Sequence, residues 1–156
     1  MNILQSSFSL LLAVSLFSIL GIADLSAQDR PANSEIGIII GEPTGLSAKF
    51  WSNDQSAFDV GLAWSFRGSG SIHLHADYLR HQVLVPETND LLFYYGLGGR
   101  MLFRDDPKVG IRIPVGLQYL IPQSRLSVFF ELVPMLNLIP ATEFDANGGL
   151  GVRYFF

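Results

Sequence analysis

From residue 34 to its end, this 156-residue chain repeats one pattern, in which apolar and polar residues alternate in segment after segment. Such alternation indicates β-strands, because successive side chains of a strand point to opposite faces of the sheet. Turn-favouring residues separate the segments, and no separating stretch is long enough to form a helix. We therefore predict eight strands, with the bounds Ser34–Gly41, Gly45–Trp51, Ser56–Phe66, Ser71–Val85, Leu91–Arg104, Lys108–Leu120, Arg125–Ile139 and Glu143–Phe156.

The short connections restrict how these strands can be arranged. Parallel neighbours need a crossover of about a dozen or more residues, whereas antiparallel neighbours can be joined by a tight turn. Eight antiparallel strands in up-and-down order can close into a barrel. Several segments also reach the roughly 9–11 residues that a tilted strand needs to cross a bilayer. The sequence therefore predicts an all-β fold, an eight-stranded antiparallel up-and-down transmembrane β-barrel.

The two faces of the predicted strands differ in size and polarity. In the last segment, Phe144, Leu150 and Val152 share one face, whereas Asp145 and Arg153 lie on the other. The interior of an eight-stranded barrel is just wide enough for side chains, so we expect the bulky apolar face to point outward, into lipid. Only 15% of the residues are charged, too few to keep such a surface soluble. A soluble lipocalin-like barrel with the apolar face inside is the alternative.

The same alternation places nine charged side chains in the barrel interior. Acids and bases are nearly balanced among them, and a buried charge that is paired can persist, whereas an unpaired one costs several kcal/mol. We therefore expect a salt-bridged plug, with a gated path or a small-ligand site as the alternative. The predicted lumen charge network consists of Glu35, Lys49, Asp59, Asp77, Arg100, Arg112, Glu131, Asp145 and Arg153.

One strand carries a pattern that could support chemistry, since His73, His75 and Asp77 follow one another at alternate positions. Side chains two residues apart on a strand share a face at about 6.6–7 Å. Such a set could bind a metal or relay a proton, but two histidines alone are weak support for either. We therefore predict no metal site, no cofactor and no enzymatic activity.

Composition excludes further classes of function. The chain has no cysteine, which excludes zinc–thiolate sites and cysteine nucleophiles. Its formal charge is −4 and it has no run of basic residues, so we expect no nucleic-acid partner.

Two prolines interrupt predicted strands. Pro114 and Pro134 cannot donate a hydrogen bond to a neighbouring strand, so each should mark a bulge or a local break. A bulge at Pro134 could reverse the facing of residues Met135 to Ile139.

The first segment of the chain differs from the rest. Residues Phe8 to Gly21 form an uncharged run of 14 residues, which suits the core of a signal peptide and is short for a spanning helix, for which about 20 residues are needed. We predict that residues 1–27 are a cleaved signal peptide, with cleavage after Ala27 or, alternatively, Ala23, and that residues 28–156 form the barrel domain. An uncleaved anchor helix is the other interpretation.

The end of the chain resembles the C-terminal signature of bacterial outer-membrane β-barrels, in which the last residue is aromatic and apolar residues precede it at alternate positions. Leu150, Val152, Tyr154 and Phe156 match these positions. The resemblance implies that the barrel-assembly machinery reads this strand as an assembly signal.

The region from residue 28 onward resembles the small OmpA/OmpX-type barrels. The resemblance implies an integral protein of a Gram-negative outer membrane, surrounded by lipid and lipopolysaccharide. The connections near Glu42, Gly68, Asp106 and Ala141 are shorter than the long outer loops usual in that family, which argues against adhesion.

The function expected from these features is a structural role in the cell envelope, with a plugged lumen. A lipid A-modifying hydrolase or acyltransferase is an alternative, since two such families use small barrels. The deacylase family has His-x-Ser on a strand, where this chain has His73-x-His75, so the nucleophile is missing. A narrow pore is the further alternative.

Overall fold

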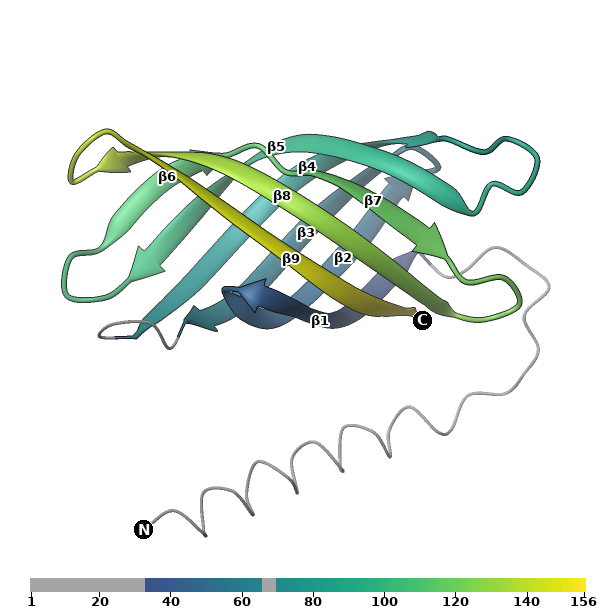
Figure 1. Ribbon diagram of the computed structural model, residues 1–156, viewed down its shortest axis with the longest axis horizontal. Helices are drawn as coiled ribbons and strands as arrows, with labels where there is room; N and C mark the ends of the chain where they lie inside the picture. The colour runs from purple at the N-terminus through teal and green to yellow at the C-terminus, as the bar shows by residue number, and fades with distance from the viewer. Residues whose placement is uncertain (1–32, 66–69) are drawn as a thin grey trace, which may run out of the picture.

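The computed structural model describes residues 33–65 and 70–156, and all of the regular structure among them is β-strand (Figure 1). The predicted signal peptide lies outside the described residues. Among the described residues, no helix is long and apolar enough to cross a membrane. The strands are β1 (Ser34–Glu42), β2 (Thr44–Asn53), β3 (Ser56–Ser65), β4 (Ser71–Val83), β5 (Leu91–Phe103), β6 (Lys108–Arg112), β7 (Val115–Leu120), β8 (Leu126–Ile139) and β9 (Glu143–Phe155).

The strands form one closed ring. Every pair of neighbours is antiparallel, and β1 pairs with both β2 and β9. Strands β6 and β7 follow each other between β5 and β8, so together they make one strand of the barrel. The ring therefore has eight strands in up-and-down order, as predicted, and Figure 1 shows them inclined around a common interior.

The break between β6 and β7 lies at Pro114, as the sequence predicts. On the neighbouring strand β8, Pro134 lies beside this break. The N–H of Ile113 donates to the carbonyl of Pro134 at 3.0 Å. The Pro114 carbonyl in turn accepts from the N–H of Gly96 at 2.9 Å. The two residues that cannot donate thus lie side by side, which confines the interruption of the ladder to one place.

The expected bulge at Pro134 is absent, because β8 continues through this residue and Met135 still faces the interior. The bulge lies four residues later, where Val109 and Gly110 of β6 pair with Ile139 and Asn137. Leu138 is the additional residue, and the side chains of Leu138 and Ile139 are both exposed. The alternation of inward and outward side chains along β8 is therefore interrupted only at the end of the strand.

The large apolar face points outward, as predicted. Phe58, Leu132 and Leu150 expose 54%, 53% and 62% of their surface. A lipocalin-like barrel would bury this face, so the structure contradicts that alternative. Inside, the larger apolar groups are few, and Tyr94 and Phe129 form the core together with Leu79.

Glycines on neighbouring strands make room for the interior aromatic rings. Phe129 lies opposite Gly151, and a Cβ atom on this glycine would stand 2.2 Å from the ring. Tyr94 lies opposite Gly116, where a Cβ atom would stand 2.5 Å from the ring. Placing each large side chain against a glycine allows a narrow barrel to be filled without overpacking.

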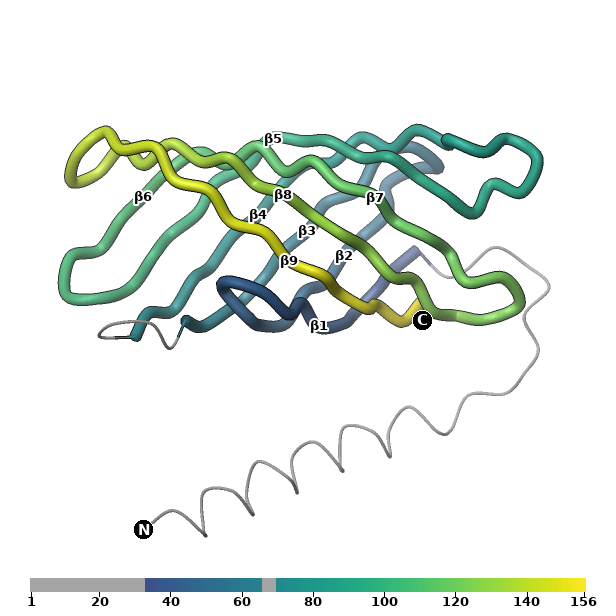
Figure 2. The backbone as a smooth tube through the Cα atoms, viewed as in Figure 1, coloured from purple at the N-terminus to yellow at the C-terminus, as the bar shows by residue number. Residues whose placement is uncertain are grey.

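One hairpin is shorter than the others. The turn between β1 and β2 stops well short of the barrel end that the β5–β6 and β8–β9 turns reach (Figure 2). Glu42 pairs with Gly148, and residues 143–147 of β9 extend beyond the last residue of β1. Along this extension, the N–H of Ala146 donates to the carboxylate of Asp145 at 2.9 Å.

We predict that Gly151→Ala lowers the free energy of unfolding by roughly 1–3 kcal/mol, because the new methyl group collides with the Phe129 ring. Gly99→Ala is the matched control, since a Cβ atom there meets nothing closer than 3.8 Å. Urea unfolding in detergent micelles measures both. Equal effects of the two substitutions would contradict this packing.

Candidate functional site

The interior of the barrel is the candidate site, because it gathers most of the charged residues that the strands carry. Eight of the nine charged residues that the sequence places inside are at most 5% exposed. The ninth, Asp145, lies at the end of the barrel away from the C-terminus, where 48% of its side chain is exposed. These side chains and their neutral partners form three groups along the barrel axis: one near the C-terminus, a central one that contains both Arg153 and Arg112, and one at the other end.

The group nearest the C-terminus surrounds Glu35. Its carboxylate accepts hydrogen bonds from Trp51 Nε1 at 2.6 Å, Ser127 Oγ at 2.8 Å and Gln118 Nε2 at 3.0 Å. The other end of the Gln118 amide accepts from Lys49 Nζ at 2.8 Å. The amide thus bridges an acid and a base, so that both charges are buried with partners.

Arg153 lies at the centre of the barrel and is 1% exposed. Its Nη2 donates to Asp59 Oδ1 at 2.9 Å and to Ser47 Oγ at 2.8 Å. Its guanidinium carbon lies 3.7 Å from the centre of the Phe129 ring. The side chain therefore combines an ion pair with a cation–π contact across the lumen.

A second central arginine is held between two carboxylates. Arg112 Nε lies 2.9 Å from Asp77 Oδ2, and Arg112 Nη2 lies 3.1 Å from Glu131 Oε1. The other oxygen of Glu131 accepts from the Tyr94 hydroxyl at 2.9 Å. These contacts connect β4, β5, β6 and β8, and they cross the lumen from one wall to the other.

The third group lies at the end of the barrel away from the C-terminus. Arg100 Nη2 donates to Asn137 Oδ1 at 2.7 Å and to Asp145 Oδ2 at 2.8 Å. Lys108 Nζ lies 2.5 Å from Glu143 Oε2 nearby. This group is more exposed than the other two, because the Asp145 and Glu143 side chains reach the rim.

The three residues that the sequence groups as a polar site, His73, His75 and Asp77, have different partners. His73 Nε2 lies 3.0 Å from Ser71 Oγ. His75 Nε2 instead approaches Asp59 Oδ2 on the neighbouring strand at 3.7 Å, and Asp77 pairs with Arg112. The sequence grouping therefore needs revision, since His73 lies apart and Asp59 takes its place beside His75.

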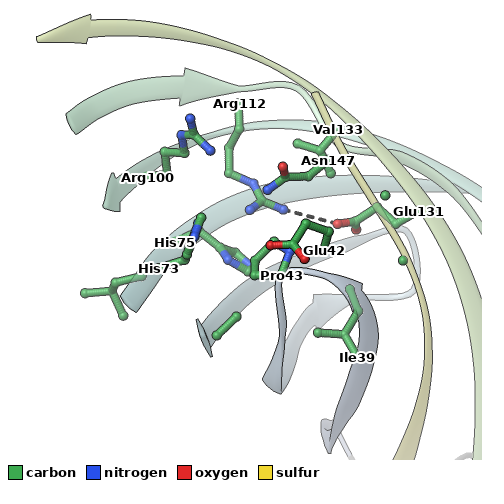
Figure 3. A pocket seen from close by; sticks show the side chains of 14 residues that line it. Ile39, Glu42, Pro43, His73, His75, Arg100, Arg112, Glu131, Val133 and Asn147 are labelled. Atoms are coloured by element: carbon green, nitrogen blue, oxygen red, sulfur yellow. Dashed lines mark hydrogen bonds and ion pairs between the residues drawn. The ribbon is translucent and has the colours of Figure 1, made fainter. Parts of the chain in front are cut away.

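A small cavity remains between these residues and the turn at Pro43, with a volume of about 30 Å³. Figure 3 shows His73, His75, Arg100, Arg112 and Asn147 around it. A cavity volume of this kind must reach roughly 10–15 Å³ to hold one water molecule. This cavity therefore has room for about two waters.

Neutral partners of the charges were missing from the interpretation of the sequence. The signal that could have found them is the alternation itself, because they occupy inward positions on the same strands as the charges. They are Ser47, His81, Tyr94, Gln118, Ser127 and Asn137.

The arrangement is similar to that of a solved bacterial barrel. The N-terminal β-barrel domain of Pseudomonas aeruginosa OprF superimposes with a TM-score of 0.63 over 81% of this chain and 100% of that chain, at 17% sequence identity. This chain has the OmpA-type barrel fold. No protein-family model matches the sequence, and no curated protein sequence matches it. The similarity to the OmpA-type domain concerns the fold.

The C-terminal residues of this OmpA-type barrel complete the ring. Leu150 and Val152 are exposed on the outer wall and pair with β1, as Tyr154 does. The N–H of Phe156 donates to the carbonyl of Ser34 at 3.0 Å. The apolar side chains at alternate positions therefore face outward along one seam of the barrel.

We predict that Arg153→Met destabilises the barrel by about 3–5 kcal/mol, because it leaves the Asp59 carboxylate buried without a counter-charge. Lys108→Met removes the same charge from a pair whose acid is exposed, so it should change stability little. Urea unfolding in detergent micelles compares them.

Adding Asp59→Asn to Arg153→Met removes the uncompensated charge and should recover part of the loss. If the double variant is no more stable than Arg153→Met, the ion pair is not the cause of the destabilisation.

Proposed function

We propose that this protein is an integral β-barrel of a Gram-negative outer membrane, with a plugged lumen and a structural role in the cell envelope. The observation that carries the proposal is the outer wall. Among the described residues, 34 large apolar side chains are exposed, against 10 buried apolar residues. Soluble monomers rarely expose contiguous apolar patches larger than about a few hundred Å². A hydrocarbon environment explains why more apolar side chains face outward than inward, because lipid replaces water around the apolar wall.

The distribution of aromatic residues supports the same environment. Trp64, Phe103, Tyr119 and Phe156 lie at or near the ends of their strands and are exposed. Aromatic side chains gather at the two membrane interfaces of such barrels. The proposed partners are therefore outer-membrane lipid and lipopolysaccharide.

Export and assembly are part of the proposal. Residues 1–27 direct the chain across the inner membrane as a cleaved signal peptide. The barrel-assembly machinery then reads the outward residues of the last strand. The resemblance of Leu150, Val152, Tyr154 and Phe156 to the C-terminal signature supports this step, together with their position at the seam between β9 and β1.

The plugged lumen distinguishes the proposed role from that of a pore. The charged groups cross the interior at three levels, and the cavity of about 30 Å³ holds only about two waters. Moving these side chains aside would separate buried charges from their partners, which costs several kcal/mol for each.

An enzymatic role has less support. A hydrolase that uses serine needs a base beside the hydroxyl and a third group that orients the base. Ser71 Oγ and His73 Nε2 satisfy the first requirement at 3.0 Å. The charges of Glu42 and Asp145 act on His73, but neither carboxylate is shown to orient its ring, so support for an oriented base is weak and the proposed function is non-enzymatic.

We predict that Leu132→Arg, at the middle of β8, destabilises the protein folded into lipid vesicles by roughly 2–4 kcal/mol, as a charge at the bilayer midplane does. Leu126→Arg is the matched control, because it carries the same change to the end of the same outward face, where the cost falls to about 0–1 kcal/mol. Urea titration in vesicles measures both. If neither substitution lowers stability, the wall does not contact lipid.

We also predict that the folded protein, reconstituted in planar lipid bilayers, gives no steady ion current. The reason is that ion pairs and hydrogen bonds of the charged side chains cross the described part of the lumen and would have to separate before ions could pass. A bacterial porin in the same bilayers provides the positive control. A steady single-channel conductance would contradict the plugged lumen and favour the narrow pore.

A further inference from the structure

Three residues with metal-binding side chains meet on the inner wall of β3 and β4. Asp59 lies directly opposite Asp77 in the register of these strands, and His75 precedes Asp77 by two residues on the same face. One ligand atom from each residue lies within 4.8 Å of the other two. A single ion between them could therefore contact all three after small side-chain movements.

Two glycines shape the space around this cluster. A Cβ atom on Gly61 would stand 2.6 Å from His75 Nε2, and a Cβ atom on Gly98 would stand 1.9 Å from Asp77 Oδ1. The imidazole ring and the carboxylate therefore occupy space that only glycine leaves open. This packing directs the ring of His75 toward Asp59, where its Nε2 lies 3.7 Å from Oδ2.

Each carboxylate uses one oxygen for an arginine, which leaves a second oxygen: Asp59 Oδ2 lies toward His75, and Asp77 Oδ1 lies over Gly98. Arg153 contacts Oδ1 of Asp59, and Arg112 contacts Oδ2 of Asp77. Asp77 is 3% exposed, and its Oδ1 has no hydrogen-bond partner among the described residues. A buried carboxylate oxygen without a partner is costly unless something binds it.

The charges of this layer also favour a cation. Asp59 and Asp77 are like charges directly opposite each other, a destabilising arrangement on a sheet. Glu131 is a third carboxylate in contact with Arg112. When Glu35 and Lys49, whose charges also act on this layer, are included, four carboxylates face three basic groups at the centre of the barrel.

The combination of one imidazole nitrogen and two carboxylate oxygens is a donor set that Zn²⁺ accepts, with water as a fourth ligand. Arg112 and Arg153 would orient the two carboxylates from behind, as outer partners of metal ligands do. His75 also lines the small cavity, which can supply the water (Figure 3).

We propose that Asp59, His75 and Asp77 form a binding site for one divalent transition-metal ion of the Zn²⁺ type inside the barrel. The bound ion links β3 to β4 and neutralises the opposed carboxylates. Because it binds the folded state, it also stabilises the barrel, by an amount that rises with the logarithm of its concentration once the site is largely filled.

The test is calorimetric titration of ZnCl₂ into the metal-stripped protein, folded in detergent micelles. We expect one Zn²⁺ per chain, and we expect His75→Ala and Asp77→Asn each to weaken binding by at least about tenfold. His73→Ala is the matched control, since His73 lines the same cavity without belonging to the ligand set, and it should retain the affinity of the unsubstituted protein.

Gly61→Ala provides a second test that removes no ligand. The added methyl group displaces the His75 ring and should weaken Zn²⁺ binding, while the three ligand residues remain. Heat-modifiable gel migration tests whether each variant is folded. If Asp77→Asn does not fold, the comparison of Zn²⁺ binding by His75→Ala and His73→Ala decides whether the proposed site exists. Absence of Zn²⁺ binding to the unsubstituted protein would overturn the proposal, as would equal losses in the two histidine variants.

Discussion

The pairing of β1 with β9 is the contact on which the rest of the structure depends. It joins the first described strand to the last and leaves an enclosed interior of fixed width. Only through this closure can Arg153, from the last strand, reach Asp59, 94 positions earlier in the chain. Contacts between positions so far apart in the chain carry a large loop-closure cost, which the pairing of the strands shares with them.

Within this enclosed space, the partners of the charges matter as much as the charges. The Gln118 amide connects Lys49 to Glu35, and the Tyr94 hydroxyl occupies the second oxygen of Glu131. Charged and polar groups can be buried when each has a hydrogen-bond or ion-pair partner. If one group is removed, its former partner remains buried without compensation for the loss of water. Among the described residues, the network is incomplete at Asp77 Oδ1, and also at His81 Nδ1, Asn137 Nδ2 and Arg153 Nη1, which are buried without a hydrogen-bond partner.

Much of the fold follows from the sequence, because alternation determines both the strands and their facing. Each predicted strand end lies within two residues of the observed one, and Pro114 divides its strand as expected. Of the two outcomes expected at Pro134, a bulge or a local break, the structure shows the break, because Pro134 lies beside Pro114, where the ladder already lacks donors, and β8 does not bend there.

The pairings inside the barrel could not be predicted in the same way. Arg112 contacts Asp77 two strands away, across β5, and such contacts depend on register and barrel curvature. Grouping His75 with its neighbours on one strand also overlooked Asp59. Residues opposite each other on adjacent strands lie about 4.5–5.5 Å apart at Cβ, closer than residues two apart on one strand.

The short hairpin of β1 and β2 has a further consequence for self-association. It leaves residues 143–147 of β9 as an open sheet edge, the kind of surface to which another strand can add. The Asp145 carboxylate occupies the N–H of Ala146 on this edge with one oxygen and pairs with Arg100 through the other. The acid that closes the end of the lumen network thus also blocks the edge against an incoming strand.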